Sequence, residues 1–184
     1  MKRAPFNLIV THYPGYDNYV AARHQLFDVL GRAMVVDDTS YSIMLLLVDD
    51  PYEAVEKIKK DLPVATPVLR VVPVDAVVDV YVDRVGPAAR DKLYEKSRDE
   101  RETFAVRVDG RLYERGEGGV IVRLSTPEAV RAVASYIDRP VNLSSPDWLV
   151  YVKTVRMYKS TNLAAVTVAR PDQIFSSVKR SAAR

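Results

Sequence analysis

The sequence predicts an α+β protein of two domains, and three observations support this. Strand and helix patterns alternate at short spacing up to about residue 82. Hydrophobic residues make up 48% of the chain and charged residues 28%, which suits a globular protein with a buried core. Residues 1–80 carry 8 Lys and Arg against 11 Asp and Glu, whereas residues 81–184 carry 19 against 13. We therefore expect one domain over residues 1–82 and a more basic one over residues 83–184.

The first domain is expected to follow the order strand, helix, strand, strand, helix, strand. Pro14 and Gly15 end the first strand, and Gly31 ends the first helix. Asp50 before Pro51 is a typical N-cap and first-turn pair for the second helix. The expected ranges are 6–13, 18–31, 32–38 and 41–48 as a hairpin, 51–62, and 68–82. This βαββαβ order is ferredoxin-like, a fold that hosts many functions.

The second domain is expected to begin with an exposed helix over residues 83–100 that carries both charges and links the two halves. A strand follows at 103–111. Ser125 and Glu128 match a capping box, and Thr126 before Pro127 is an alternative cap; either predicts a helix that ends near Ile137. Two further strands are expected at 148–158 and 163–170. The basic tail 174–184 is expected to fray.

The composition excludes several classes of protein. The chain has no cysteine, so disulfides, thiolate catalysis and cysteine-based metal sites are all ruled out. The longest apolar run, residues 43–48, has the length of a buried strand and not of a membrane span. The first residues reach proline and glycine too early for the apolar core of a signal peptide. We therefore expect a cytoplasmic protein without a membrane partner.

The residue patterns also argue against an enzyme. His12 and His24 have no histidine or acidic partner at the spacing of a metal site. The acidic pairs 37–38 and 49–50 suit turn and N-cap positions better than a catalytic dyad. The Gly116–Gly119 stretch lacks the Lys and Ser or Thr of a phosphate-binding loop. We expect no catalytic residue, no metal and no cofactor.

The basic residues of the second half are the positive functional signal. Guanidinium and ammonium groups hold phosphates, and tyrosines stack on unpaired bases. A well-solvated surface from a heat-adapted organism would produce the same charge balance, and the charge alone does not separate the two interpretations. The candidate RNA-binding residues are Lys96, Arg98, Arg101, Arg107, Arg111, Arg115, Arg123, Lys153, Arg156 and Lys159.

The stretch RPVNLSSPDWLVYV, residues 139–152, places turn-forming residues between a helix pattern and a strand pattern. Val-Asn-Leu-Ser-Ser-Pro-Asp at 141–147 resembles the Val-Asp-Leu-x-x-Pro-Asp signature of the THUMP domain, an RNA-binding module of tRNA-modifying proteins. The resemblance covers about residues 84–170, and a ferredoxin-like segment is the usual companion domain. Asn142 stands where the family has an acidic residue, and residues 112–124 form a longer insert than expected. The signature is chiefly architectural in the family.

The resemblance implies an α/β THUMP domain after the ferredoxin-like domain and a tRNA partner bound near its acceptor stem. Because little chain follows the last expected strand, we expect no catalytic domain. Size and arrangement are similar to stand-alone THUMP proteins of the Tan1 type, which are adaptors that hold tRNA for a separate RNA cytidine acetyltransferase. An alternative is the RNA-binding subunit of another split tRNA-modifying enzyme, such as a methyltransferase. A third is a small-molecule-binding protein that uses His12, Tyr13 and Asp37.

Overall fold

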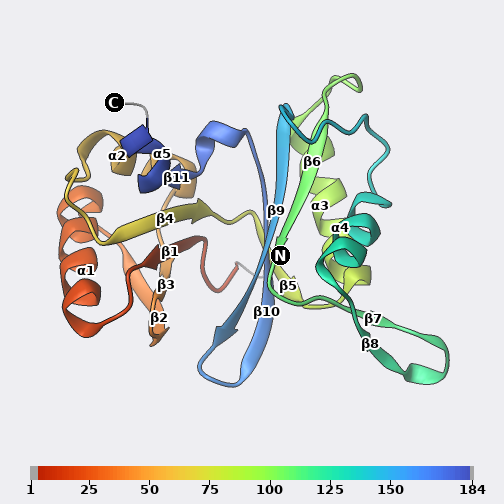
Figure 1. Ribbon diagram of the computed structural model, residues 1–184, viewed down its shortest axis with the longest axis horizontal. Coiled ribbons are helices and arrows are strands. Elements are labelled where there is room, and N and C mark those ends of the chain that lie inside the picture. The colour runs from red at the N-terminus through yellow and green to blue at the C-terminus, as the bar shows by residue number, and fades with distance from the viewer. Residues whose placement is uncertain (1–3, 183–184) are drawn as a thin grey trace. The chain divides into compact units, whose positions relative to one another are not determined.

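The computed structural model describes residues 4–182 (Figure 1). The chain divides into two compact units. Unit 1 comprises residues 1–74 and 172–184, and unit 2 comprises residues 75–171. The expected boundary after residue 82 therefore differs from this division in two places. Residues 75–82 belong with the second unit, and the segment after Pro171 returns to the first.

Unit 1 contains the predicted βαββαβ order. Its five-stranded antiparallel sheet has the order β11-β4-β1-β3-β2, in which β4-β1-β3-β2 is the ferredoxin-like arrangement. The elements are β1 (Leu8–His12), α1 (Tyr16–Leu30), β2 (Met34–Ser40), β3 (Ile43–Leu47), α2 (Pro51–Asp61), β4 (Val68–Pro73), β11 (Phe175–Ser176) and α5 (Ser177–Ala182).

The packing of unit 1 follows from its apolar pattern and its caps. Ala22 and Leu26 of α1 and Ile58 of α2 are buried against the β-strands in one hydrophobic cluster. The Asp50 side chain accepts hydrogen bonds from the backbone N–H groups of Tyr52 and Glu53, as expected of an N-cap. The tail 174–184 was expected to fray, but over residues 175–182 β11 adds to β4 as a further strand and α5 follows; residues 183–184 lie outside the described part of the chain.

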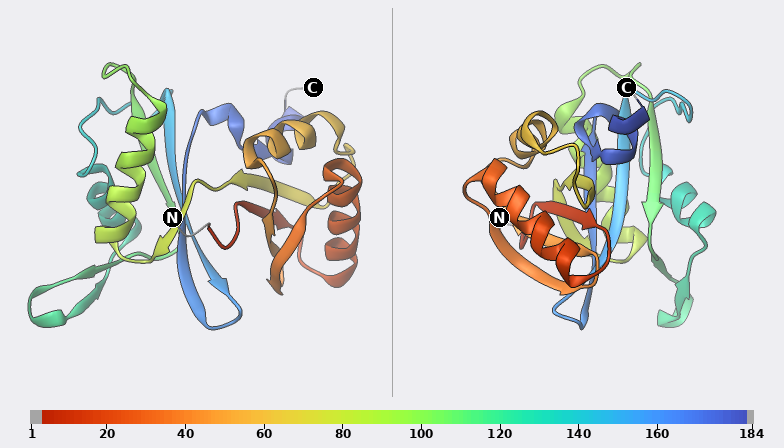
Figure 2. Two further views of the ribbon diagram at one scale, coloured as in Figure 1. Left: turned by 180° about the vertical axis from the view of Figure 1, so that it is seen from behind. Right: turned by 60° about the vertical axis from the view of Figure 1, so that its left-hand side comes forward.

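Unit 2 is built around a four-stranded sheet of order β5-β10-β9-β6. Strand β6 runs parallel to β9, and the other pairs are antiparallel. A separate two-stranded sheet, β7-β8, extends from the unit as a hairpin (Figure 2). The elements are β5 (Ala76–Asp79), α3 (Val82–Lys96), β6 (Phe104–Asp109), β7 (Tyr113–Arg115), the 3-10 turn η1 (Glu117–Gly119), β8 (Ile121–Arg123), α4 (Thr126–Ala134), β9 (Trp148–Met157), β10 (Thr161–Ala169) and the 3-10 turn η2 (Pro171–Gln173).

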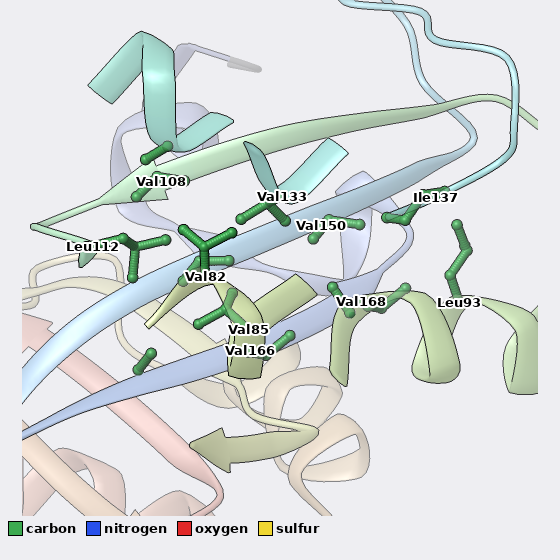
Figure 3. Packing of buried hydrophobic residues seen from close by; sticks show 14 of the residues in the cluster. Val82, Val85, Leu93, Val108, Leu112, Val133, Ile137, Val150, Val166 and Val168 are labelled. Atoms are coloured by element: carbon green, nitrogen blue, oxygen red, sulfur yellow. The ribbon is translucent and has the colours of Figure 1, made fainter. Parts of the chain in front are cut away.

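Helix α3 is a core element, and the expectation of an exposed linking helix is wrong. Val82, Val85, Ala89 and Leu93 are buried and pack with α4 and the sheet (Figure 3). Their spacing keeps them on one side of the helix, while the charged residues occupy the other side. Gly86 permits a close approach to the segment that follows α4, because a Cβ there would lie 2.2 Å from the Tyr136 ring.

The expected long strand over residues 68–82 is also wrong. It divides into β4 in unit 1 and β5 in unit 2. Asp75 at the division is held within unit 2: its carboxylate accepts hydrogen bonds from Lys96 Nζ at 2.7 Å and from the backbone N–H of Val168 at 2.7 Å. The predicted capping box of α4 is confirmed, with Ser125 and Glu128 exchanging side-chain to backbone hydrogen bonds.

Candidate nucleic-acid interface

The β7-β8 and β9-β10 hairpins project at the same end of unit 2 (Figures 1 and 2). A cavity of about 270 Å³ lies at this end. One side is the base of the β7-β8 hairpin, and the other is the outer part of the β9-β10 hairpin. The backbone that leads into α3 completes it. The cavity is lined by Val80, Gly110, Arg111, Tyr113, Thr154, Val155, Arg156 and Asn162.

Gly110 sets the geometry of this cavity. Its φ is +114°, a conformation that L side chains rarely adopt, and a Cβ at this residue would lie 1.8 Å from Thr154 Oγ1. Only glycine allows β6 to end this close to β9. The backbone N–H of Arg111 then donates to Thr154 Oγ1 at 3.2 Å. This contact fixes the position where the Arg111 side chain leaves the backbone.

Beside the cavity, Tyr81 at the start of α3 lies next to Tyr113 and Arg115 of the β7-β8 hairpin. The rings of Tyr81 and Tyr113 lie 6.5 Å apart, and the Arg115 guanidinium lies 4.2 Å from the centre of the Tyr81 ring. The backbone N–H of Tyr113 donates to the carbonyl of Val80 at 3.0 Å, which anchors the hairpin base. Planar groups of this kind stack on nucleic-acid bases.

Further cations surround this end of unit 2. In the β7-β8 register, Tyr113 pairs with Arg123, and Arg115 pairs with Ile121, so these four side chains share one face of the hairpin. On the β9-β10 hairpin, Arg156 pairs with Asn162. The turn that follows contains Lys159, which is exposed. Five of the ten predicted residues therefore gather here: Arg111, Arg115, Arg123, Arg156 and Lys159.

Two predicted residues lie on the opposite face of the same sheet. The register pairs Arg107 with Tyr151 and Asp109 with Lys153, on the face away from α3 and α4. Lys153 Nζ lies 2.7 Å from Asp109 Oδ2, and its side chain is 13% exposed. The Arg107 guanidinium lies 5.9 Å from the centre of the Tyr151 ring. Lys153 is thus engaged locally, while Arg107 stays exposed.

The remaining three predicted residues lie at the other end of unit 2, at the last residue of α3 and just after it. Lys96 Nζ is paired with Asp75 and donates to the carbonyl of Val168 at 2.8 Å, which is a structural arrangement. Arg101 is paired with Asp99 at 3.0 Å, and this hydrogen-bonded arginine lowers the pKa of the Asp99 carboxyl. Arg98 is exposed.

The 139–152 stretch is at this second end, away from the cavity. The Asn142 side-chain oxygen accepts hydrogen bonds from the backbone N–H groups of Ser144 and Ser145, at 3.2 and 3.1 Å. Asp147 Oδ2 accepts from both the backbone N–H and the hydroxyl of Thr103, at 2.7 and 3.0 Å. These bonds hold the segment against the start of β6, so its role in this fold is architectural.

Glu102 forms a cluster at the same end that sequence reasoning missed. Its carboxylate accepts hydrogen bonds from the Ser97 hydroxyl, from Trp148 Nε1 at 2.8 Å and from Arg170 at 2.7 Å. These hydrogen bonds, that of Ser97 first, lower the pKa of Glu102 to about 2. Arg170 also stacks on the Trp148 ring, 3.9 Å from its centre.

The groups suggested for small-molecule chemistry do not gather in one site. His12 lies on β1 and Asp37 on β2, with β3 between them in the sheet. His12 is buried, with Nδ1 2.7 Å from the carbonyl oxygen of Tyr13, whereas the Tyr13 side chain is exposed. His24 is exposed and lies 3.5 Å from Asp28. No group of three His, Cys, Asp or Glu residues within 4–182 is arranged to hold a metal ion.

The sequence offers no direct assignment to a family, since no family model and no curated protein matches it. In the part of the chain that the structure describes, no helix is both long enough and apolar enough to cross a membrane.

Solved structures share the fold. The crystal structure of PH1313 from Pyrococcus horikoshii OT3 is similar with a TM-score of 0.62 and 12% identity, over 90% of this chain and 55% of that one. A 4-thiouridine synthetase in complex with RNA and ATP matches with a TM-score of 0.50 and 15% identity, over 90% of this chain and 42% of that one. A predicted N6-adenine-specific DNA methylase from Listeria monocytogenes matches with a TM-score of 0.52 and 14% identity, over 88% of this chain and 40% of that one. The chain spans about half the length of these proteins or less, and the likeness establishes an α+β, THUMP-like fold.

Proposed function

We propose that this chain is a non-catalytic tRNA-binding module that presents tRNA to a separate modifying enzyme. The observation that carries the proposal is the cavity between the two hairpins, where arginine side chains meet Tyr113 at one end of unit 2. Unpaired nucleotides are recognised by such stacking surfaces, whereas an RNA duplex is held through its phosphates. A tRNA acceptor arm offers both, because an unpaired 3′ end follows a duplex stem.

The fold supports the same assignment. One of the similar structures is a 4-thiouridine synthetase bound to RNA, so a protein of this fold binds RNA. We place the acceptor stem of the tRNA along the cations of the two hairpins and its unpaired end in the cavity. The catalytic partner is proposed to be an RNA cytidine acetyltransferase. The RNA-binding subunit of another split tRNA-modifying enzyme, such as a methyltransferase, is the second candidate.

A paired set of variants tests the site. Replacing Arg111 and Arg156 with alanine removes two cations that line the cavity, and we expect tRNA affinity to fall about 10- to 100-fold. The matched control replaces Arg98 and Arg101, two exposed arginines at the other end of the unit, and should change affinity less than about threefold. Equal losses in both double variants would refute the proposed site, and absence of tRNA binding by the unaltered chain at low salt would refute the function.

The RNA ligands separate acceptor-end recognition from general binding. Fluorescence anisotropy would compare intact tRNA, tRNA without its unpaired 3′ nucleotides and a duplex of unrelated sequence. Intact tRNA should bind tightest, and the Arg111 and Arg156 variant should lose most of that preference. The partner is tested separately, by measuring cytidine acetylation of tRNA by a purified RNA cytidine acetyltransferase with and without this chain. If no stimulation occurs while tRNA binds, the acetyltransferase assignment is wrong and the methyltransferase alternative is tested next.

A further inference from the structure

The cavity between the β7-β8 and β9-β10 hairpins contains one polar side chain whose chemistry differs from that of the cations. Asn162 lines the cavity from the start of β10 and is exposed. Its side-chain amide makes no hydrogen bond with any other group in the part of the chain that the structure describes. An amide carries both donors and an acceptor, whereas the guanidinium groups beside it only donate. Asn162 therefore suits a partner that offers a donor and an acceptor side by side.

The strand register shows which face of the sheet carries the Asn162 side chain. Asn162 pairs with Arg156, and two residues further along β10, Ala164 pairs with Thr154. Ala164 belongs to the core that α3 and α4 cover, and residues two apart on a strand share a face. Residues paired across an antiparallel ladder also share a face. The Asn162 amide, the Arg156 guanidinium and the Thr154 hydroxyl therefore lie on one face of the β9-β10 hairpin.

Tyr113 reaches the same cavity through the end of β5. Leu163 pairs with Asp79 in the antiparallel β10-β5 ladder, so Val80 follows at the level of Asn162. The backbone N–H of Tyr113 donates to the Val80 carbonyl at 3.0 Å. Tyr113 and Asn162 thus line the cavity from neighbouring segments. Proteins hold an unpaired base in this way, with an aromatic ring stacked on its face and polar groups bonded to its edge.

The size and charge of the cavity suit a single nucleotide. Pockets for drug-sized ligands enclose about 300–1,000 Å³, and this cavity encloses about 270 Å³. Arg111 and Arg156 also line it. Charge-assisted hydrogen bonds to phosphate are stronger than neutral ones to a base, so these two guanidinium groups are expected to hold the phosphates beside the bound nucleotide. The edge of the base is then left to Asn162.

We propose that Asn162 makes the cavity selective for adenine at the end of the unpaired 3′ strand. This selectivity rests on the proposed tRNA binding, because it concerns the base that the same cavity holds. Adenine has its N6–H donor beside an acceptor on both of its hydrogen-bonding edges, N1 on one and N7 on the other, so an amide matches either edge with two hydrogen bonds. Guanine presents two acceptors, N7 and O6, on the second edge, which an amide matches poorly. Pyrimidines lack that second edge and have a smaller ring to stack on Tyr113.

Binding of tRNAs that differ only in their last unpaired nucleotide tests the proposal. Fluorescence anisotropy compares tRNA that ends in adenosine, cytidine, guanosine or uridine. The unaltered chain should bind the adenosine form about tenfold more tightly than the others, as expected of one bidentate base contact. Asn162→Ala should reduce this preference to about twofold or less. Thr161→Ala is the matched control, because Thr161 is the exposed neighbour on the opposite face of β10, and it should keep the preference.

A change in the RNA distinguishes base recognition from a structural role of Asn162. Purine riboside in place of the last adenosine removes only the 6-amino group, which is the donor that the Asn162 side-chain oxygen would accept from. The unaltered chain should bind this tRNA about fivefold or more weakly than the adenosine form, whereas Asn162→Ala should bind the two equally. This coupling between the two changes is expected only if the amide and the amino group are hydrogen-bond partners.

The outcomes separate the failure of adenine selection from the failure of the proposed function. A chain that binds no tRNA at low salt would refute both. Binding of tRNA with equal affinity for the four terminal bases, or an adenine preference that Asn162→Ala keeps, would overturn the selection by Asn162 and leave tRNA binding intact. A guanine preference that Arg156→Ala abolishes would also overturn it, because arginine pairs with guanine through O6 and N7 and would then be the residue that recognises the base.

Discussion

Gly110→Ala is a direct test of how the cavity is built, because two costs add at this residue. Its φ of +114° is a conformation that side chains rarely adopt, which costs about 1–2 kcal/mol. The new Cβ would also lie 1.8 Å from Thr154 Oγ1 and 2.9 Å from Thr154 Cβ, and relief of such overpacking costs about 1–3 kcal/mol. We expect a loss of about 2–5 kcal/mol in the free energy of unfolding.

Urea denaturation followed by circular dichroism measures this loss, and two comparisons assign it. Gly31 also has a positive φ, of +67°, but no atom lies within 4 Å of the Cβ that an alanine would add. Gly31→Ala should therefore lose only the part of the unfolding free energy that comes from the backbone conformation. Thr154→Ala removes the Oγ1 atom that the new Cβ would meet. Gly110→Ala should therefore cost about 1–2 kcal/mol less in the Thr154→Ala protein than in the unaltered protein. Equal costs for Gly110→Ala with and without Thr154 would refute the steric explanation of the cavity geometry.

Other predictions concern the end of unit 2 that holds the 139–152 stretch. The folded-state pKa of Glu102 is lowered to about 2, so its contribution to stability is full above the unfolded-state pKa near 4.5 and is lost as pH falls toward 2. Glu102→Gln should cost about 1–3 kcal/mol at pH 7 and flatten the stability profile between pH 4.5 and 2, as measured by urea denaturation at each pH. Asp147→Ala removes the acceptor of two Thr103 hydrogen bonds and should cost about 1–3 kcal/mol, while tRNA affinity at low temperature changes less than about twofold. A large loss of affinity in this folded variant would mean that the 139–152 stretch contacts RNA.

The fold was predictable where the signals were local. Pro14 and Gly15, the Asp50 cap and the Ser125 capping box all lie within a few residues of the boundaries they set. Helix α3 shows a different case: its buried residues do recur at helical spacing, but the mixed charges between them suggested an exposed helix. The break between β4 and β5 could not be predicted, because it depends on contacts of Asp75 with residues 96 and 168, far along the chain.

The candidate site was predictable in its residue types and not in its layout. A basic second half indicates phosphate binding, but only the strand registers show that Arg107 and Lys153 lie on the face opposite Arg156. The role of Tyr113 also depends on the register of β7 with β8 and on its contact with Val80, neither of which has a sequence signal. The long insert at 112–124, a departure from the THUMP pattern, is the segment that forms this hairpin.

The distribution of the cations leads to a quantitative expectation for salt dependence. Each phosphate contact changes the slope of log affinity against log salt concentration by about −0.7 to −0.9. Lys96, Arg101 and Lys153 already have carboxylate partners, and Arg98 and Arg107 lie away from the cavity. If the five cations at the hairpin end make the contacts, the slope should be about −4, whereas all ten candidates together would produce about −7 to −9. Replacing Arg111 and Arg156 should reduce the magnitude by about 2, and the Arg98 and Arg101 control should leave it unchanged. A measured slope near −8 would mean that the RNA surface extends over both ends of unit 2 and that the hairpins hold only part of it.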